Sequence, residues 1–450
     1  MLIEKETDKF IKVIRILIPD KPGVLGKLLY TIGEEGANIG DIWRVRFGLT
    51  HNVRDIEIYL NTEKHLEKVL NAIGQLEGII IEEVYDPVLL MHKNGKIGVH
   101  SKIQLDSIAK LRKAYTPGVA KVCKEIANNP TGLEEYTWIN NTVAIITNGT
   151  AVLGLGDIGV KASLPVMEGK AVLLDQLVGL NGIPILIPSK DIDVFTQSVI
   201  AISESFGAIN LEDIAAPMCF EIEDKLLAAE LDKPIMHDDQ HGTAVVVLAS
   251  LLNASKHAGI PLKHESVGLI GLGAAGIGIA KLLKAYGITR LYGYDISKNA
   301  VDFFEKKIQG TALLLEELMK KAKIVIATTG QKSLIKPSLI QAGQVILALS
   351  NPYPEISPED ALEAGAKFAA DGRSVNNAVA YPGIYKGALR ARARRIGNRM
   401  KIEAAKIIAT YAEEGDILPS VLNKKMHEAV VRSIEKATYE SGLAKIISEY

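Results

Sequence analysis

Apolar and polar residues alternate near the start of the chain, where Ile14, Ile16 and Ile18 occupy every second position. This period of two predicts a β-strand, and the apolar residues that follow recur at the spacing of an amphipathic helix. A second set of these patterns comes next and includes a strand-like segment over 53–60. The order strand, helix, strand, strand, helix, strand predicts a ferredoxin-like α+β module over residues 1–86.

The pattern changes in the second half of the chain, where short apolar segments alternate with helical stretches. Such alternation predicts βαβ units with parallel strands. The predicted strands cover residues 267–270, 291–294, 324–327, 345–348 and 366–369. Short helices and glycine turns fill the region before them. We therefore expect an α/β fold with three domains: the module over 1–86, an α/β domain over 87–237, and a doubly wound domain with C-terminal helices over 238–450.

A glycine-rich turn, Gly-Leu-Gly-Ala-Ala-Gly, follows the predicted strand at 267–270 and precedes a helical pattern. In that context the glycines allow a tight turn and a close approach to a pyrophosphate, which the helix N-terminus attracts. The sequence therefore predicts a Rossmann-type dinucleotide site. Its cofactor-binding residues are predicted to be Gly271, Gly273, Ala274, Ala275 and Gly276.

Asp295 ends the next predicted strand, where an acidic side chain binds the ribose hydroxyls of the cofactor. Its charge disfavours a 2′-phosphate and so favours NAD, although Ser297 and Lys298 nearby could offset that charge. The choice between NAD and NADP therefore stays open. A second match to the glycine pattern lies at 154–159, but the segment that follows it is broken by Pro165 and lacks a downstream partner strand that ends in an acidic residue. We interpret that turn as part of the substrate cleft.

Two acidic pairs, Glu212-Asp213 and Asp238-Asp239, precede or follow strongly apolar segments. Buried carboxylates that converge are suitable ligands for a hard divalent cation such as Mg²⁺ or Mn²⁺. The flanking His237 and His241 stand four residues apart and resemble a zinc-hydrolase spacing, an alternative that the dominance of oxygen ligands disfavours.

The composition of the chain limits the classes of binding partner that we expect. The 450 residues carry a formal net charge of −1, which gives no electrostatic reason to expect nucleic acid or an anionic membrane as a partner. No apolar run reaches the ~20 residues that span a bilayer, and the start of the chain lacks the apolar core of a signal peptide. Cys123 and Cys219 are the only cysteines, too few for a disulfide framework. We expect a cytoplasmic protein that acts on small metabolites.

Six segments together resemble the malic enzymes, which convert L-malate to pyruvate and CO₂ with NAD⁺ or NADP⁺ and a divalent metal ion. They lie in the family's order over about residues 100–390, and their amino-acid sequences most resemble those of the short bacterial type. The segments are 114–120, 154–159, 165–171, 211–213, 237–243 and 349–352.

The resemblance implies a role for each matching residue. Lys170 matches the general base, Tyr115 the acid that protonates the enolpyruvate carbon, and Asp238 a residue that assists the base. A lysine base requires burial or nearby positive charge to lower its pKa. Glu212, Asp213 and Asp239 match the metal ligands. Asn351, which also borders the predicted cofactor site, and Asn377 match substrate-binding amides, alongside Tyr115 and Lys170.

One departure concerns the substrate carboxylate. Larger family members carry an arginine just before the glycine turn at 154–159, whereas residues 148–151 offer no cation here. The group that holds the carboxylate is therefore open, with Lys161, Arg373 and backbone amides as candidates. The family likeness also suggests a homodimer whose neighbouring subunit supplies Tyr115 or Lys170.

The segments 19–25 and 36–39 make the N-terminal module look like an ACT domain, a family that commonly binds small effectors. The alternative for this module is a dimerisation element without a ligand. For the whole chain, two alternatives remain: a metal-independent amino-acid or hydroxy-acid dehydrogenase of similar domain plan, and a non-catalytic sensor of nucleotide and effector.

Overall fold

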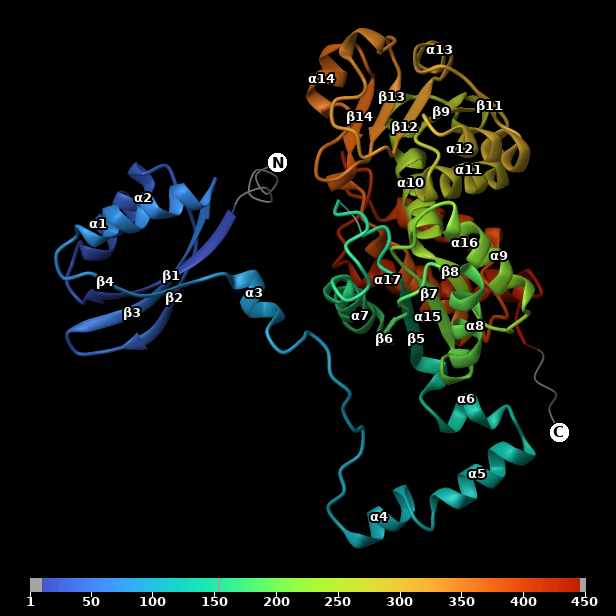
Figure 1. Cartoon of the computed structure of the whole chain (residues 1–450), viewed down its shortest axis with the longest axis horizontal. Helices are drawn as coiled ribbons and strands as arrows, with labels where there is room; N and C mark the ends of the chain where they lie inside the picture. The colour runs from blue at the N-terminus through green and yellow to red at the C-terminus, as the bar shows by residue number, and fades with distance from the viewer. Residues whose placement is uncertain (1–9, 153, 446–450) are drawn as a thin grey trace. The chain divides into compact units, whose positions relative to one another are not determined.

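The chain folds into two compact units, one that ends at Gly98 and a larger one that begins at Val99. The structure, a computed structural model, describes residues 10–152 and 154–445. Figure 1 shows the smaller unit in blue and the larger one from cyan to red. Within the described ranges, no helix has the length and apolar character needed to cross a membrane.

The N-terminal unit contains a four-stranded antiparallel sheet with the strand order β2-β3-β1-β4. Its strands are β1 (Phe10–Pro19), β2 (Asn38–Phe47), β3 (His51–Leu60) and β4 (Ile80–Tyr85), and its helices are α1 (Val24–Glu34) and α2 (Glu63–Gly74). The βαββαβ order confirms the predicted ferredoxin-like module.

Alternate residues of β1 form the core of this unit. Ile14 and Ile16 are 0% exposed, and they pack in one cluster with Leu28 of α1 and Val69 of α2. Because successive side chains of a strand point to opposite faces, one face of the sheet is covered by both helices. The alternation seen in the sequence is therefore the signature of this helix-covered face.

Short helices connect this unit to the sheets of the larger one. They are α3 (Pro87–His92), α4 (Ile108–Ala114), α5 (Val119–Asn128) and α6 (Gly132–Tyr136). No residue of α3, α4 or α5 is buried, although these helices carry several large apolar side chains. Much of their apolar surface is therefore exposed within the part of the chain that the structure describes.

The larger unit begins with a four-stranded parallel sheet of order β6-β5-β7-β8. Its strands are β5 (Thr142–Thr147), β6 (Asn181–Leu186), β7 (Ala208–Leu211) and β8 (Ile235–His237), connected by α7 (Leu164–Val178), α8 (Ile192–Ile202) and α9 (Met218–Ala228). All residues of β5, β7 and β8 are buried, which explains why these strands are apolar without alternation.

A second parallel sheet has the order β11-β10-β9-β12-β13-β14. Its strands are β9 (Val267–Ile270), β10 (Leu291–Tyr294), β11 (Thr311–Ala312), β12 (Ile324–Ala327), β13 (Val345–Ala348) and β14 (Phe368–Asp371). Its helices are α11 (Ala274–Tyr286), α12 (Lys298–Phe303), α13 (Leu315–Lys321) and α14 (Pro358–Glu363). This order is that of the doubly wound dinucleotide fold, which confirms the predicted Rossmann-type domain.

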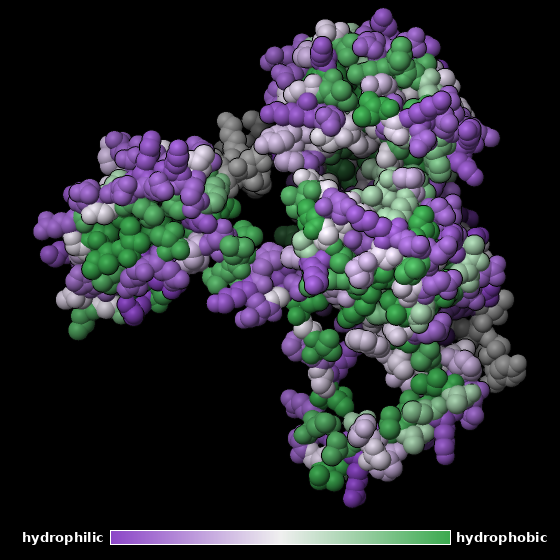
Figure 2. Space-filling view, viewed as in Figure 1, coloured by the Kyte–Doolittle hydropathy of each residue, from purple (hydrophilic) through white to green (hydrophobic). Residues whose placement is uncertain are grey.

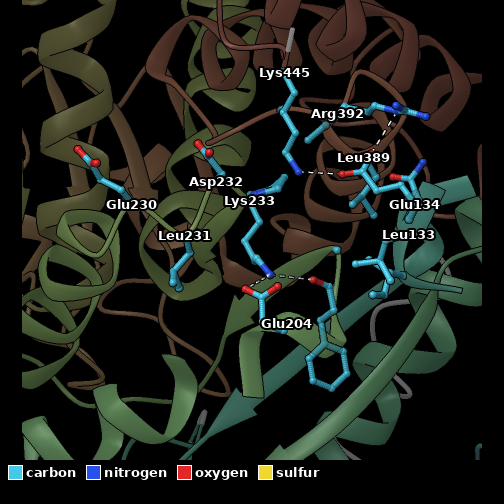
Figure 3. Close-up of a pocket in the computed structure, with 17 residues that line it drawn as sticks. Leu133, Glu134, Glu204, Glu230, Leu231, Asp232, Lys233, Leu389, Arg392 and Lys445 are labelled. Carbon is cyan, nitrogen blue, oxygen red and sulfur yellow. Dashed lines mark hydrogen bonds and ion pairs between the residues drawn. The ribbon is translucent and has the colours of Figure 1, made fainter. Parts of the chain in front are cut away.

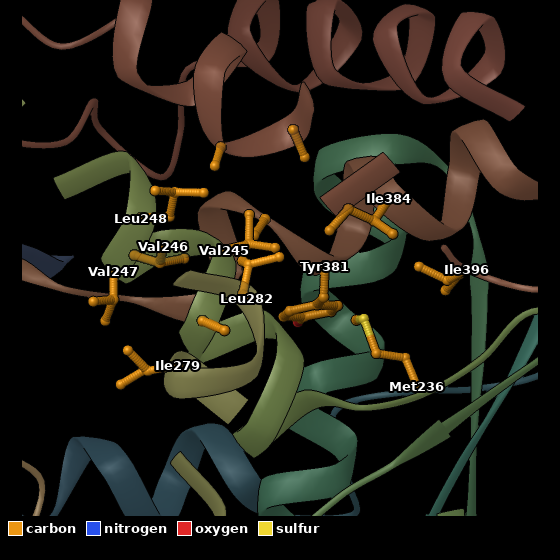
Figure 4. Packing of buried hydrophobic residues seen from close by; sticks show 14 of the residues in the cluster. Met236, Val245, Val246, Val247, Leu248, Ile279, Leu282, Tyr381, Ile384 and Ile396 are labelled. Atoms are coloured by element: carbon orange, nitrogen blue, oxygen red, sulfur yellow. The ribbon is translucent and has the colours of Figure 1, made fainter. Parts of the chain in front are cut away.

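The helix α10 (Asp238–Ala258) follows β8 directly and leads to the second sheet. Its middle is buried on all sides, and Figure 4 shows its valines, Val245 to Val247, packed near Ile279 and Leu282 of α11. The two helices approach closely because Gly278 has no side chain: a Cβ there would lie 2.2 Å from the carbonyl oxygen of Gln240.

The C-terminal helices α15 (Tyr381–Arg390), α16 (Asn398–Thr410) and α17 (Lys424–Glu440) return toward the first sheet. The buried hydroxyl of Tyr385 lies within hydrogen-bonding distance of the carbonyl oxygens of Ile209 in β7 (3.1 Å) and Met236 in β8 (3.2 Å). In Figure 1, α15 accordingly lies beside β7 and β8, and α17 packs against α15 and α7. The end of the chain therefore completes the core beneath the first sheet.

Candidate active site

A largely buried lysine and several carboxylates meet at the carboxyl edge of the first sheet. Lys170 comes from the middle of α7, and its Nζ lies 3.0 Å from Oε1 of Glu212 and donates a short hydrogen bond to Oδ2 of Asp238. Glu212 follows β7, and Asp238 opens α10 directly after β8. Because β7 and β8 are parallel neighbours, the residues after their ends are brought to one edge.

The predicted metal ligands form one group. Carboxylate oxygens of Glu212, Asp213 and Asp239 all lie within 4.8 Å of one another. Asp239 accepts a hydrogen bond of 3.0 Å from the backbone N–H of Asp213, while Oδ2 of Asp213 is buried without a hydrogen-bond partner. Asp213 has a left-handed backbone with φ of 52°, an arrangement that is rare outside glycine and aims its side chain into the group.

The electrostatics of this group show a shortage of positive charge. Burial and the neighbouring Asp239 raise the pKa of Glu212 well above its usual range and the pKa of Asp213 to about 7. An unpaired buried oxygen and crowded carboxylates are the conditions that a divalent cation relieves. These residues therefore fit a hard cation by charge, ligand type and spacing.

The pKa of Lys170 is shifted in the direction opposite to that of a lysine base. Burial alone would lower this pKa, but Asp238 and Glu212 outweigh burial and hold it well above its usual range. The chain alone therefore keeps Lys170 as an ammonium ion. The ring of Tyr381 lies 4.5 Å from Nζ and forms one wall of the lysine's surroundings.

The structure does not bring Tyr115 into this group. Tyr115 lies at the C-terminal end of α4 and is 68% exposed. The groups that contact the Lys170 ammonium are instead Glu212, Asp238 and Tyr381. The predicted acid and the predicted base are thus separate within one chain.

The predicted substrate amides follow two strands of the second sheet, Asn351 after β13 and Asn377 after β14. Asn351 donates a hydrogen bond of 3.1 Å to the carbonyl oxygen of Gly372. The amide of Asn377 is bonded to the hydroxyl of Thr243 on α10, at 3.0 Å. Among the suggested carboxylate clamps, Arg373 is paired with Asp371 at 2.7 Å. The structure therefore leaves the choice of clamp open.

The glycine-rich turn has the form that a dinucleotide site requires. Gly271 has φ of 93°, and a Cβ on Gly276 would lie 2.0 Å from the carbonyl oxygen of Gly271. By contrast, a Cβ on Gly273 would meet no protein atom within 4 Å, so open space lies in front of it. Gly273 caps α11 without a side-chain hydrogen bond, and the helix N–H groups that begin at Ala274 and Ala275 face that space.

Asp295 lies at the carboxyl end of β10, as predicted. Its Oδ2 accepts a hydrogen bond of 2.7 Å from the backbone N–H of Leu272, and its Oδ1 accepts one of 2.8 Å from that of Ser297. The carboxylate therefore ties the glycine-rich turn to the start of α12, with its negative charge beside the turn.

The two histidines do not form a zinc site within the described residues. Nε2 of His241 lies 2.9 Å from Oε2 of Glu223, and His237 is fully buried with no hydrogen bond to its ring. Sequence reasoning missed Glu223 and Tyr381. No local pattern marks them, because only the folded chain brings α9 and α15 to this place.

A separate cavity of about 420 Å³ opens at the opposite edge of the first sheet. Its lining includes residues that precede β5, β7 and β8, so it lies at their amino ends. Figure 3 shows that its cations already have partners: Lys445 and Arg392 reach Glu134, and Lys233 reaches toward Glu204. This cavity is therefore distinct from the lysine and carboxylate group.

A Rossmann sheet with its glycine-rich turn, together with a largely buried lysine and a carboxylate group suited to a cation, defines a pyridine-nucleotide-dependent oxidoreductase. Comparison with known proteins narrows this class. Residues 96–191 match the family description "Malic enzyme, N-terminal domain", and residues 240–311 match "Malic enzyme, NAD binding domain". The N-terminal module lies outside both matches.

Relatives agree over nearly the whole chain. It is 48% identical to NAD-dependent malic enzyme 1 of Bacillus subtilis, over 95% of this chain and 97% of that protein. It is 40% identical to the NAD-dependent malic enzyme of Geobacillus stearothermophilus, over 92% and 91%. The crystal structure of the malic enzyme from Pyrococcus horikoshii matches with a TM-score of 0.76 and 38% identity, over 80% of this chain and 92% of that one. The chain belongs to the malic enzyme family.

Proposed function

We propose that Lys170, Asp238 and the three carboxylates carry out the reaction of this family, the oxidative decarboxylation of L-malate to pyruvate and CO₂ with reduction of NAD(P)⁺. The observation that carries the proposal is the meeting of Lys170 with Glu212 and Asp238 beside the group of Glu212, Asp213 and Asp239. A metal-independent dehydrogenase has no use for such a costly concentration of buried acids.

We propose that Glu212, Asp213 and Asp239 hold Mg²⁺ or Mn²⁺. The support is the spacing of their oxygens and the buried Oδ2 of Asp213, which lacks a hydrogen bond in the chain alone. When bound, the cation supplies the positive charge that polarises the C2 oxygen of malate and stabilises the charge released as CO₂ leaves. Asn210 donates a hydrogen bond of 2.9 Å to Oε2 of Glu212 and so orients one ligand.

Lys170 is proposed to take the proton from the C2 hydroxyl as the hydride passes from C2 to the nicotinamide. For that it must first be neutral, and Asp238 is the partner placed to receive its proton. Engagement of Glu212 in cation binding removes one of the two charges that hold the pKa of Lys170 high. Asn351 and Asn377 are proposed to hold the substrate by their amides, with Asn351 also next to the cofactor.

Tyr115 is proposed to protonate the enolpyruvate carbon in the active site of a second subunit, which makes the protein a homodimer. The support is that α4 and α5 expose apolar residues, among them Ile108 and Leu111, together with Tyr115 itself. Figure 2 shows hydrophobic residues on the surface of this segment. Exposed apolar patches of this kind mark protein interfaces.

NAD is the proposed cofactor, bound by Gly271, Gly273, Ala274, Ala275, Gly276 and Asp295. The charge of Asp295 beside the glycine-rich turn disfavours the 2′-phosphate of NADP. Two of the relatives described above are named NAD-dependent.

The proposed domains are an ACT-like module over 1–86, a substrate domain over 87–237 and the nucleotide domain over 238–450. The three separate sheets support this division. We propose that the module binds a small effector, on the support of its ferredoxin-like topology and its exposed apolar residues on β2, such as Trp43 and Phe47. A cytoplasmic location is proposed from the two free cysteines, which suit a reducing compartment.

Replacement of Asp239 by Asn tests the metal assignment. The variant removes one ligand charge with little change of shape, so Mn²⁺ affinity should fall by at least about tenfold and malate oxidation should fall with it. Mn²⁺ binding is measured by the EPR signal of the free ion, and turnover by NADH absorbance with malate, NAD⁺ and varied Mn²⁺. Unchanged Mn²⁺ dependence would remove Asp239 from the site.

A further inference from the structure

Glu223 is a buried carboxylate that the proposed mechanism does not use. It lies on α9, is only 4% exposed, and faces the first turn of α10. Three donors from that turn converge on it. They are the backbone N–H of His237 at 3.0 Å, Nε2 of His241 at 2.9 Å and Nε2 of Gln240 at 3.4 Å.

These contacts replace an ordinary helix cap. The first four N–H groups of an α-helix have no partner within the helix, and a side chain at the N-cap usually accepts one of them. His237 occupies the N-cap of α10 but forms no such bond, and its own N–H is accepted by Glu223 from another helix. The position of the first turn of α10 is thus set by α9.

This first turn carries both aspartates of the site. Asp238 and Asp239 are the first two residues of α10 and reach different partners, Lys170 and the metal-binding group. No side-chain hydrogen bond from the N-cap residue holds the first turn of α10, so the directions of the two aspartate side chains depend on what else fixes that turn. A change of helix direction at this end would move both carboxylates together.

The environment of Glu223 keeps it ionised. Burial alone would raise the pKa of Glu223, but the hydrogen bond from His241 and the charge of Lys401 oppose burial and hold this pKa below its usual range. Lys401 is itself buried on α16. A buried charge that is fully hydrogen-bonded from one element and balanced from another fixes those elements relative to each other.

We propose that Glu223 is a positioning residue that holds the first turn of α10 so that Asp239 faces the cation and Asp238 faces Lys170. The inference rests on the proposed metal site of Glu212, Asp213 and Asp239. It assigns to α9 a part in metal binding, although α9 contributes no ligand.

Two substitutions of Glu223 distinguish its role in positioning α10 from the effect of its negative charge. Glu223→Ala removes the acceptor for His237, so Mn²⁺ should bind about 10–100-fold more weakly, the cost typical of a lost partner behind the metal ligands. Glu223→Gln keeps a carbonyl oxygen for that N–H, and His241 can accept from the new amide in its other tautomer. We therefore expect Gln to restore most of the affinity. The full-length protein is titrated with Mn²⁺ alone and followed by EPR.

Two variants of the same helix serve as controls. Glu221→Gln removes an exposed carboxylate of α9, and Ile222→Val trims a fully buried apolar side chain next to Glu223. The second should lower the melting temperature without moving Mn²⁺ affinity, since it touches no donor of α10. This control distinguishes a general loss of stability from a displacement of the first turn of α10.

Several outcomes overturn the inference. These are wild-type Mn²⁺ affinity in Glu223→Ala, equal losses in the Ala and Gln variants, or a loss in Ile222→Val as large as that in Glu223→Ala. Failure of the proposed metal site gives a different result, because the Asp239→Asn variant then binds Mn²⁺ like the wild type. The kinetic readout agrees with the inference if the Mn²⁺ activation constant of Glu223→Ala rises more than kcat falls.

Discussion

Lys170 is held as an ammonium ion by Asp238 and Glu212, although the family role assigned to it is that of a base. The sequence indicated that a base here needs a lowered pKa, and the chain's own charges shift the pKa upward. The residue and its partners were thus found from the motif, while its protonation state depends on charges that only the folded site brings together.

Replacement of Lys170 by Met tests this residue. Methionine keeps much of the length and removes the proton acceptor, so kcat for malate should fall by about 10²–10⁴-fold, the usual worth of a general base. NADH binding, measured by fluorescence, should stay at the wild-type level because Lys170 lies on α7 beside the first sheet, whereas the glycine-rich turn follows β9 of the second sheet. A kcat within threefold of wild type would contradict the role.

At the scale of elements, the glycine-rich turn between β9 and α11 predicts different effects for alanine substitutions at two of its glycines, Gly273 and Gly276. A Cβ on Gly273 meets no protein atom, so Gly273→Ala should fold normally but place a methyl group where the pyrophosphate binds. We expect the Kd for NADH to rise at least about tenfold, which corresponds to about 1.4 kcal/mol. Fluorescence titration gives the Kd, and calorimetry gives the melting temperature.

Gly276→Ala is the matched comparison, because its Cβ would clash with the carbonyl oxygen of Gly271 inside the protein. It should lower the melting temperature as well as the affinity. If Gly273→Ala binds NADH normally, the open space in front of that residue does not receive the cofactor.

Elements with strong local patterns were predictable from the sequence. The strands β9, β10, β12 and β13 have the predicted bounds, because each is a short apolar run between turn residues. The last strand was predicted over 366–369 and is Phe368–Asp371. Its start is set by pairing that the sequence does not show: the N–H of Gly343 donates to Gly365, and Lys367 donates to Gln344.

The open face of the N-terminal sheet carries a cross-strand network that predicts a pH dependence. The hydrogen bond from Arg15 to Asp55 in β3, at 2.8 Å, outweighs burial and lowers the pKa of Asp55. A lowered pKa stabilises the fold above the unfolded value of about 3.9 and loses that contribution as pH falls through the folded value. Asp55→Asn should therefore destabilise the module at neutral pH, by about 1.5–3 kcal/mol.

The difference between wild type and Asp55→Asn should shrink as the pH falls below about 4. Urea unfolding followed by Trp43 fluorescence, in a Trp138→Phe background, reports on the module. The control is Glu83→Gln, which removes the exposed partner of Arg15 and should change stability by less than about 1 kcal/mol. A constant difference from pH 7 to pH 3 would contradict the assignment to Asp55.

For the whole molecule, the separation of Tyr115 from Lys170 predicts an active site shared between subunits. Tyr115→Phe and Lys170→Met should each be nearly inactive alone. A hybrid dimer of the two has one site with both residues intact and one with neither, so it should recover about half of the wild-type activity. Differently tagged chains, co-expressed and purified through both tags, supply the hybrid for assay.

An inactive hybrid dimer would place both residues of each site in one chain and would remove the reason for a shared site. Assembly itself is checked by sedimentation, with the Leu111→Lys variant as a test of the apolar surface on α4.

The two sheets of the larger unit have a practical consequence for protein engineering. The proposed metal ligands and Asp238 follow β7 and β8, while Asp295, the residue proposed to bind the ribose, follows β10 on another sheet. The loop at Asp295 can therefore be mutated to accept a different nucleotide without changing the residues proposed to act on malate. By the same reasoning, a library aimed at new hydroxy acids should leave that loop untouched and vary the edge of the first sheet together with Asn351 and Asn377, which follow β13 and β14.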